Sequence, residues 1–258
     1  MKNAILLVAY GAATLQGRRV LVSIDKRVRE SFPGFAVRWA YSSEIVRKRL
    51  IKSRLKSDSV LKALQRLIFE HFTGIVLQPL QTIPGKEHED IKQDMHKVGL
   101  EQPHLQLYLG NPLLSSFRDI ARVAKSLLQY LPIDRKPFED VIFMGHGSKH
   151  PASFWYTALH ADVQALDKFV HVGTMEGQIN LNYLLPRLTS ERVWLMPLLS
   201  TVGRHTLQDM AGSSHSSWRS CLEASGHLCF PVLKGTAEHS AIVDIWLDHL
   251  RQAAWPLL

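Results

Sequence analysis

Three polar residues of the kinds that bind metal ions lie in the second half of the chain. His146, Glu176 and His205 each stand shortly after a run of apolar residues. If those runs are parallel strands, the residues that follow them emerge at one edge of the sheet and can converge in space. Two imidazoles and a carboxylate suit a borderline divalent cation such as cobalt, iron, nickel or zinc. An imidazole, whose ordinary pKa is about 6.5, can also take up protons near neutral pH.

The histidines also have an ordinary structural interpretation, because in a chain with 13 histidines any one of them is more often a surface or helix-cap residue than a ligand. Gly145 and Gly147 flank His146 and let a ligand approach the backbone closely, which favours a functional role. Spacing alone leaves Glu176 open between a metal ligand and a solvated carboxylate. We expect structural roles for four other histidines: His150, His160, His171 and His239.

Several familiar catalytic patterns do not occur in the sequence. It has no phosphate-binding G-x-x-x-x-G-K-[ST], no G-x-S-x-G of a serine hydrolase and no G-x-G-x-x-G after an apolar run. His88 and Glu89 lack the second histidine of a zincin. Cys221 and Cys229 do not form a C-x-x-C pair, so a thiolate zinc site or a redox motif is not indicated, and a reducing compartment is expected.

Short apolar runs alternate with helical patterns along the whole chain, which is typical of a parallel α/β protein. The spacing of Val20, Ile24 and Val28 predicts one of the helices. Continuously apolar runs predict strands that are buried on both faces of the sheet. The predicted strands cover residues 4–9, 35–40, 74–80, 105–109, 141–144, 169–174, 193–198 and 227–232.

The two halves of the chain resemble each other. Residues 4–12 match 140–148 in pattern, and the Pro-Leu pairs that end at Leu80 and Leu198 are each followed by a glycine six positions after the proline. Two chance strands would not share that spacing. The Pro-containing segment 131–137 is the predicted linker. We therefore predict two similar domains, 1–131 and 138–258, with the metal ligands in the second and the loops after the strands of both halves lining one cleft.

The positive charge of the chain is concentrated near its N-terminus. The formal net charge is +8, yet 13 basic and 4 acidic residues up to Asp58 give that segment +9. Such a region suits nucleic acid, an anionic membrane surface or a polyanionic small molecule. No RNA motif or helix-turn-helix accompanies it, and no apolar run is long enough to span a membrane. The basic stretch 44–56 predicts an amphipathic helix with Ile45, Leu50, Ile51 and Leu55 on its apolar side, either simply solvated or steering a ligand.

Several motifs together resemble the anaerobic sirohydrochlorin cobalt chelatases of the CbiK type. They are Met-Gly-His-Gly-Ser at 144–148, Leu-Gly-Asn-Pro-Leu-Leu-Ser-Ser at 109–116, Leu-Met-Pro-Leu at 195–198, Gly-Arg-His-Thr-Leu-Gln-Asp-Met at 203–210, and Trp218. The resemblance implies a class II chelatase fold of two Rossmann-like halves. It also implies ATP-independent insertion of Co2+ into sirohydrochlorin, with loss of two pyrrole protons, in anaerobic cobalamin biosynthesis.

The same resemblance implies the roles of individual residues. The family's two histidines and glutamate fall on His146, Glu176 and His205, where His146, assisted by His205, would accept pyrrole protons and Glu176 would neutralise the cation. We expect substrate contacts from Tyr10, Gly11, Leu80, Glu87, Leu114, Ser115 and Leu198. Co2+ is then a substrate and no organic cofactor is needed. The expected protein is cytoplasmic and a homo-oligomer, with no nucleic-acid or membrane partner.

Some positions depart from the family pattern. Arg204 replaces an acidic residue before the second histidine, and residues 212–217 replace an acidic stretch. The family's opening Ser-Phe-Gly-Thr is replaced by the residues at 9–12. A cation beside a metal ligand weakens the binding of a dication. Insertion of iron or nickel therefore stays open, as does a tetrapyrrole- or haem-binding protein without chelatase activity.

Overall fold

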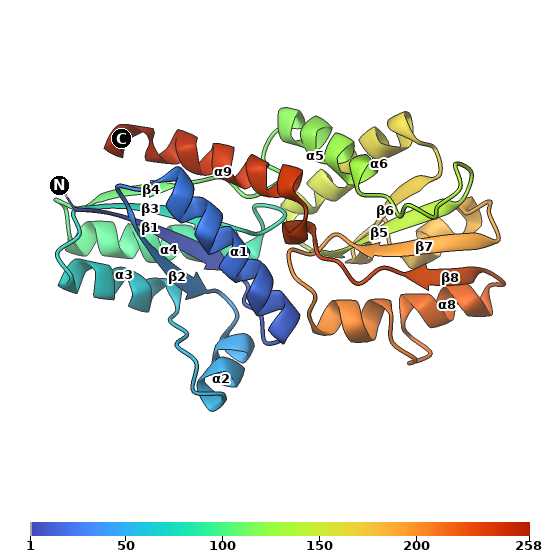
Figure 1. Cartoon of the computed structure of the whole chain (residues 1–258), viewed down its shortest axis with the longest axis horizontal. Helices are drawn as coiled ribbons and strands as arrows, with labels where there is room; N and C mark the ends of the chain where they lie inside the picture. Colours follow the sequence, from blue (N-terminus) through green and yellow to red (C-terminus); the bar gives the residue numbers. More distant parts are fainter. Residues whose placement is uncertain (1) are drawn as a thin grey trace. The chain divides into compact units, whose positions relative to one another are not determined.

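The computed structural model describes residues 2–258 and contains two parallel four-stranded sheets (Figure 1). The strand orders are β2-β1-β3-β4 and β6-β5-β7-β8, so the second sheet repeats the first strand for strand. The contacts divide the chain into two compact units. Unit 1 comprises the chain up to Leu113 together with Val243–Leu258, and unit 2 is Leu114–Ile242.

The elements of the first sheet and its helices alternate along the chain. They are β1 (Asn3–Ala9), α1 (Leu15–Ser31), β2 (Ala36–Tyr41), α2 (Glu44–Lys52), α3 (Val60–Phe69), β3 (Gly74–Pro79), α4 (Lys86–Glu101), β4 (Gln106–Leu109) and the C-terminal α9 (Ser240–Ala254).

The second sheet is built in the same way. Its elements are α5 (Phe117–Gln129), β5 (Asp140–Gly147), α6 (Phe154–Leu166), β6 (Val170–Glu176), α7 (Leu181–Leu184), β7 (Arg192–Pro197), a π-helix (His205–Met210), α8 (Trp218–Ala224) and β8 (Leu228–Pro231). All eight strands predicted from the sequence are therefore confirmed, as is the parallel α/β class. The domain division at 131–138 stays a prediction, since the contacts group α5 with unit 2 and most of α9 with unit 1.

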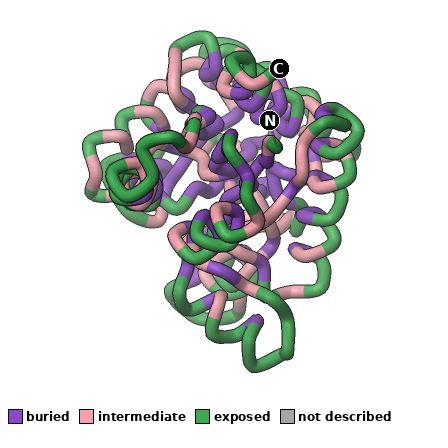
Figure 2. Tube along the Cα trace, turned by 90° about the vertical axis from the view of Figure 1, so that its left-hand side faces the viewer, coloured by how far each residue is buried: buried purple, intermediate pink, exposed green. Residues whose placement is uncertain are grey.

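The apolar runs form strands because helices cover both faces of each sheet. Ile5, Leu6 and Leu7 are completely buried although they point to alternate faces of β1. Figure 2 shows the buried positions gathered in the interior and the exposed positions on loops and outer helix turns. No helix within residues 2–258 combines the length and the apolar character that crossing a membrane requires.

Equivalent hydrogen bonds support the internal repeat. The N–H of Leu80, just after β3, donates to the carbonyl of Val8 in β1 at 2.8 Å, and the N–H of Leu198, just after β7, donates to Met144 in β5 at 2.7 Å. In each sheet the leucine of the Pro-Leu pair is therefore hydrogen-bonded to the neighbouring strand, which is β1 in the first sheet and β5 in the second. The shared sequence spacing reflects a shared backbone path.

The basic helix is shorter than predicted and its apolar face differs. α2 ends at Lys52, and Arg54 adopts a left-handed conformation with φ of 57°. Val46 and Leu50, four residues apart, are the buried pair, whereas Ile45 and Ile51 are 62% and 61% exposed. The prediction of an apolar side through Ile45, Ile51 and Leu55 is therefore wrong, because a helical turn places the first two outside the buried stripe.

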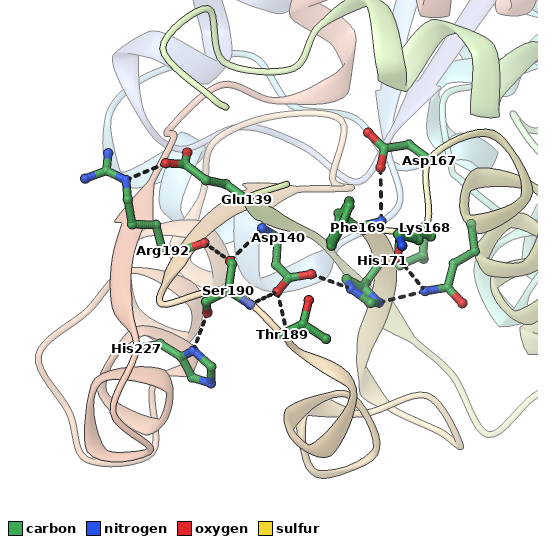
Figure 3. Close-up of polar contacts among 12 residues, drawn as sticks. Glu139, Asp140, Asp167, Lys168, Phe169, His171, Thr189, Ser190, Arg192 and His227 are labelled. Atoms are coloured by element: carbon green, nitrogen blue, oxygen red, sulfur yellow. Dashed lines mark hydrogen bonds and ion pairs between the residues drawn. The ribbon is translucent and has the colours of Figure 1, made fainter. Parts of the chain in front are cut away.

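A buried polar network anchors the amino-terminal ends of the second sheet (Figure 3). Asp140, 1% exposed at the start of β5, accepts hydrogen bonds from His171 Nε2 and from the N–H groups of Thr189 and Ser190. Burial alone would raise the pKa of Asp140, but these hydrogen bonds hold it below its ordinary value. The network ties β5, β6 and the segment before β7 together at the edge opposite His146.

Candidate functional site

The carboxyl edge of the second sheet brings the ends of β5 and β6 unusually close. Gly147 pairs with Glu176, has φ of 76°, and lies where an added Cβ would meet the carbonyl oxygen of Glu176 at 1.9 Å. Only glycine fits this approach. The flanking glycines of His146 therefore place it, as the sequence suggested, at a crowded strand end beside the backbone of Glu176.

His146 has a defined tautomer. Its ring is exposed and its Nδ1 lies 3.0 Å from the carbonyl oxygen of Gly147. Because a carbonyl oxygen can only accept, Nδ1 carries the hydrogen, and the lone pair of the neutral ring is on Nε2. That nitrogen is free to bind a cation or a proton.

His205 is held in the same tautomer by a carboxylate. It begins the π-helix, and its Nδ1 lies 2.7 Å from Oδ2 of Asp209, four residues later. A carboxylate accepts, so Nδ1 donates and Nε2 again has the free lone pair. The side chains of His205 and Asp209 are 35% and 42% exposed. An outer carboxylate of this kind fixes the tautomer and the orientation of a metal-binding imidazole.

The two imidazoles lie together. Their ring centroids are 5.0 Å apart and the ring planes are nearly perpendicular, at 89°. Each ring has its Nδ1 committed to a neighbour on its own strand or helix, so each offers only Nε2. The pair can bind one borderline divalent cation and can take up protons as the cation leaves.

Glu176 does not complete a cluster in this arrangement. It is exposed at the last position of β6, and among residues 2–258 no three His, Cys, Asp or Glu side chains are grouped so that they could hold a metal ion. The structure therefore brings His146 and His205 together and brings only the backbone of Glu176 to the same edge. A third-ligand role for its carboxylate stays a prediction.

The residues predicted to contact substrate fall into two groups. Leu80, Leu114 and Leu198 are 3%, 0% and 0% exposed, so they pack in the core and offer no surface to a ligand in this structure. Tyr10 is 44% exposed after β1, and Glu87 is exposed in the first turn of α4.

The other two expected substrate contacts have local structural roles. Gly11 has φ of 118°, and a Cβ there would meet Val46 at 2.7 Å. Ser115 donates a hydrogen bond to Asp119 at 2.8 Å.

The four histidines expected to be structural all have structural partners. His150 accepts from the N–H of Ala152, His160 accepts from Val172, His171 donates to Asp140, and His239 lies on Tyr130 with ring centroids 3.9 Å apart. Burial lowers the pKa of His160 and of His239 to about 4. His160 and His239 are buried in the core, and with the pKa lowered by burial their imidazoles are neutral near pH 7.

The sequence analysis did not predict that Asp209 accepts a hydrogen bond from His205, or that Arg204 is hydrogen-bonded within the π-helix segment. The spacing of His205 and Asp209, four residues apart in a helical segment, is the signal that could have found the carboxylate. Arg204 donates from Nε to Oε1 of Gln208 at 3.0 Å. Its guanidinium is thus held along the outside of the π-helix.

The cations of the first 58 residues differ in their partners. Five form ion pairs with carboxylates: Lys26, Arg27, Arg29, Arg38 and Lys48. In the part of the chain that the structure describes, four cationic side chains at and beyond the end of α2 have no such partner: Arg49, Lys52, Arg54 and Lys56. These four cations lie close together in the chain, and Arg18 and Arg19 on α1 likewise have no carboxylate partner among the described residues.

A pocket of about 280 Å³ in unit 1 contains none of the predicted site residues. It lies beside β2 and α3. Two of its lining cations, Arg38 and Arg66, are paired with Glu70 and Asp58, and the third is Lys56. The pocket thus shares no lining residue with the candidate site on the second sheet.

Comparisons with known proteins agree with the motifs. The family described as "Cobalt chelatase (CbiK)" matches residues 3–255. The chain is 50% identical over 255 residues to sirohydrochlorin cobaltochelatase CbiKC of Nitratidesulfovibrio vulgaris, covering 98% of this chain and 90% of the relative. It is 33% identical over 259 residues to the sirohydrochlorin cobaltochelatase of Salmonella typhimurium, covering 98% and 97%.

The fold also matches a solved chelatase. The structure of SirB from Bacillus subtilis with Fe3+ superposes with a TM-score of 0.71 at 16% identity, covering 98% of this chain and 96% of that one. At that identity the likeness shows the fold alone, and it confirms the predicted class II chelatase architecture. With the family match over nearly the whole length, the resemblance drawn from the motifs is confirmed: the chain belongs to the cobalt chelatase (CbiK) family.

Proposed function

We propose that this protein inserts Co2+ into sirohydrochlorin, without ATP, in anaerobic cobalamin biosynthesis. The observation that carries the proposal is the pair His146 and His205, with centroids 5.0 Å apart and both Nε2 lone pairs free at the carboxyl edge of the sheet. Family membership and the names of both curated relatives support cobalt as the metal and sirohydrochlorin as the tetrapyrrole.

The reaction exchanges one cation for two protons. Co2+ binds first to Nε2 of His146 and of His205. Glu176 is the third ligand, and its carboxylate partly neutralises the charge of the cation. As the ring nitrogens take over the metal, the two imidazole lone pairs are released, and they accept the two protons that the two N–H pyrrole nitrogens lose. Asp209, hydrogen-bonded to Nδ1 of His205, stabilises the imidazolium that forms there.

The basic region attracts the substrate. Sirohydrochlorin is a polycarboxylate, and the unpaired cations around the end of α2 raise its local concentration by long-range attraction. Arg49 and Lys52 on α2 and Lys56 after it serve this role, since no carboxylate neutralises them in the described chain.

The protein acts in the cytoplasm as a homo-oligomer and uses no organic cofactor. Cys221 and Cys229 are free thiols, which suits a reducing compartment. Neither nucleic acid nor a membrane is a partner in this proposal.

A parallel chelation assay tests the function and the metal together. Purified protein is mixed with sirohydrochlorin and Co2+, Fe2+ or Ni2+, and the absorbance of each metallated product is followed against a protein-free control. The proposal expects the largest acceleration with Co2+. Faster insertion of Fe2+ or Ni2+ would reassign the metal, and tetrapyrrole binding without any acceleration would show a carrier instead of an enzyme.

A further inference from the structure

Three aromatic side chains form a partly exposed cluster at the amino-terminal ends of α5 and α6. The ring centroids of Phe117 and Phe154 are 6.3 Å apart, those of Phe117 and Trp155 are 5.7 Å apart, and those of Phe154 and Trp155 are 5.6 Å apart. Phe117 is 70% exposed and Phe154 is 53% exposed. Large aromatic rings that touch one another yet face solvent mark a surface for a ligand or a partner.

This cluster is fixed to the strand that carries His146. α5 and α6 pack side by side (Figure 1), and α6 starts shortly after β5 ends. In the first turn of α6, Tyr156 lies so close to Gly145 that a Cβ on the glycine would meet Tyr156 Cε1 at 2.7 Å. The residue before His146 and the helix that carries two of the rings are thus in direct contact.

The loop between them is also tightly hydrogen-bonded. The N–H of His150 donates to Ser148 Oγ at 3.0 Å, the N–H of Ala152 donates to His150 Nδ1 at 3.1 Å, and Ser153 Oγ donates to the carbonyl of Ser148. The rings therefore have a fixed position at the same sheet edge as His146 and do not sit on a mobile loop.

Two free cations accompany the rings. Arg118 follows Phe117 in α5, and Lys149 lies in the loop before α6; both are exposed. Within residues 2–258 neither side chain forms an ion pair with a carboxylate. The nearby carboxylate of Asp119 is buried and accepts hydrogen bonds from Ser115 and Ser116. Exposed rings, with unpaired cations beside Phe117 in the chain and in the loop before α6, complement a flat conjugated molecule with carboxylates on its rim.

We propose that Phe117, Phe154 and Trp155 form a stacking platform for one face of the tetrapyrrole macrocycle, while Arg118 and Lys149 bind its peripheral carboxylates. This inference rests on the proposed function, because it takes sirohydrochlorin as the occupant. It assigns tetrapyrrole recognition in unit 2 to the aromatic cluster and not to Leu114 or Leu198, which are buried.

The test combines a double variant with a matched control. Phe117→Ala with Phe154→Ala removes two rings whose exposure makes misfolding a small risk, and Phe69→Ala removes an 85% exposed ring on α3 in unit 1. Metal-free sirohydrochlorin is titrated into each protein and its Kd is measured from the absorbance change. Co2+ binding is measured separately by calorimetry, and the unfolding temperature checks the fold.

The platform predicts a sirohydrochlorin Kd about tenfold or more higher in the double variant, with the Co2+ Kd unchanged and the control equal to wild type. In the chelation assay the KM for sirohydrochlorin rises while kcat at saturation changes little. The single variant Phe117→Tyr, which retains a ring at this position, keeps most of the wild-type affinity for sirohydrochlorin. An unchanged sirohydrochlorin Kd overturns the inference, and weaker self-association in sedimentation with normal tetrapyrrole binding would assign the cluster to a second copy of the chain.

The outcomes separate this inference from the proposed function. Wild-type protein that accelerates Co2+ insertion, together with a double variant that binds sirohydrochlorin normally, refutes the platform and leaves the function intact. Wild-type protein that binds sirohydrochlorin through the rings but does not accelerate insertion supports the platform and contradicts the function.

Discussion

Asp209 Oδ2 accepts a hydrogen bond from Nδ1 of His205 at 2.7 Å, across one turn of the π-helix. This contact decides which nitrogen of His205 can bind a metal ion. His146 reaches the same state by donating to the carbonyl of Gly147. The tautomer of His205 is therefore fixed by a side chain and that of His146 by the backbone. Only the contact of His205 can be removed by substitution.

Replacing the carboxylate tests its positioning role. In Asp209→Ala the Nδ1 hydrogen of His205 loses its acceptor, so we expect the Kd for Co2+, measured by calorimetry, to rise about 10- to 100-fold. Sirohydrochlorin binding should be unchanged, and Asp209→Glu should recover part of the metal affinity. Glu223→Gln is the matched control, since Glu223 pairs with Arg219 in another exposed four-residue spacing. A Co2+ Kd that does not change in Asp209→Ala would contradict the role.

The strand end at Gly147 should tolerate no side chain. Gly147→Ala places a Cβ against the carbonyl of Glu176 and retains an unfavourable positive φ, so we expect a loss of about 2 kcal/mol or more in the free energy of unfolding. Gly99→Ala in α4, where a Cβ meets no atom within 4 Å, should instead gain about 0.5–1 kcal/mol. Urea unfolding measures the free energy of unfolding of both variants. The same change in both would show that the close approach at Gly147 does not constrain the fold.

The buried histidines make stability depend on pH in a stated direction. The pKa of His160 is lowered by burial to about 4, while the unfolded chain takes up that proton near its ordinary value of about 6.5. Between those values the unfolded state binds more protons, so the free energy of unfolding falls as pH decreases from about 6.5 to about 4.

A substitution isolates this contribution. In His160→Asn the amide oxygen can still accept from the N–H of Val172, and the slope of unfolding free energy against pH should become shallower by at most about 1.4 kcal/mol per pH unit within that window. Denaturation at several pH values provides the measurement. A slope identical to that of wild type would mean that His160 does not titrate with unfolding.

The unpaired cations at and after the end of α2 should influence the encounter with the substrate more than the chemistry. Lys52→Gln with Lys56→Gln is expected to lower the apparent association rate of sirohydrochlorin about 2- to 10-fold at low salt, with the difference shrinking as salt is added. The control is Lys26→Gln with Lys92→Gln. It changes the net charge by the same amount, but at lysines that are already paired with Glu30 and Glu89. Stopped-flow mixing compares the two double variants, and equal association rates of sirohydrochlorin would contradict the steering role.

The sequence predicted the architecture well because its signals are local and strong. Fully apolar runs such as that of β1 can only be satisfied by burial on both faces, and the repeated Pro-Leu spacing follows from a repeated backbone path. His146 was recognisable because its flanking glycines reflect a real steric requirement at the strand end.

Other features depend on contacts that no local pattern records. Phe117 meets Trp155 only because α5 packs beside α6, and Leu198, expected to contact the substrate, is completely buried. Asp209 reaches His205 through a π-helical turn, a geometry that apolar periodicity does not predict. Glu176 was identified through the family resemblance, since its spacing alone left its role open.

The most direct test of the account is the initial rate at which His146→Ala converts sirohydrochlorin and Co2+ into the metallated product, followed by absorbance, with His104→Ala as an exposed-histidine control. The account predicts that His146→Ala falls close to the protein-free rate while still binding metal-free sirohydrochlorin with the wild-type Kd, and that the control retains wild-type activity. Undiminished cobalt insertion by His146→Ala would contradict it.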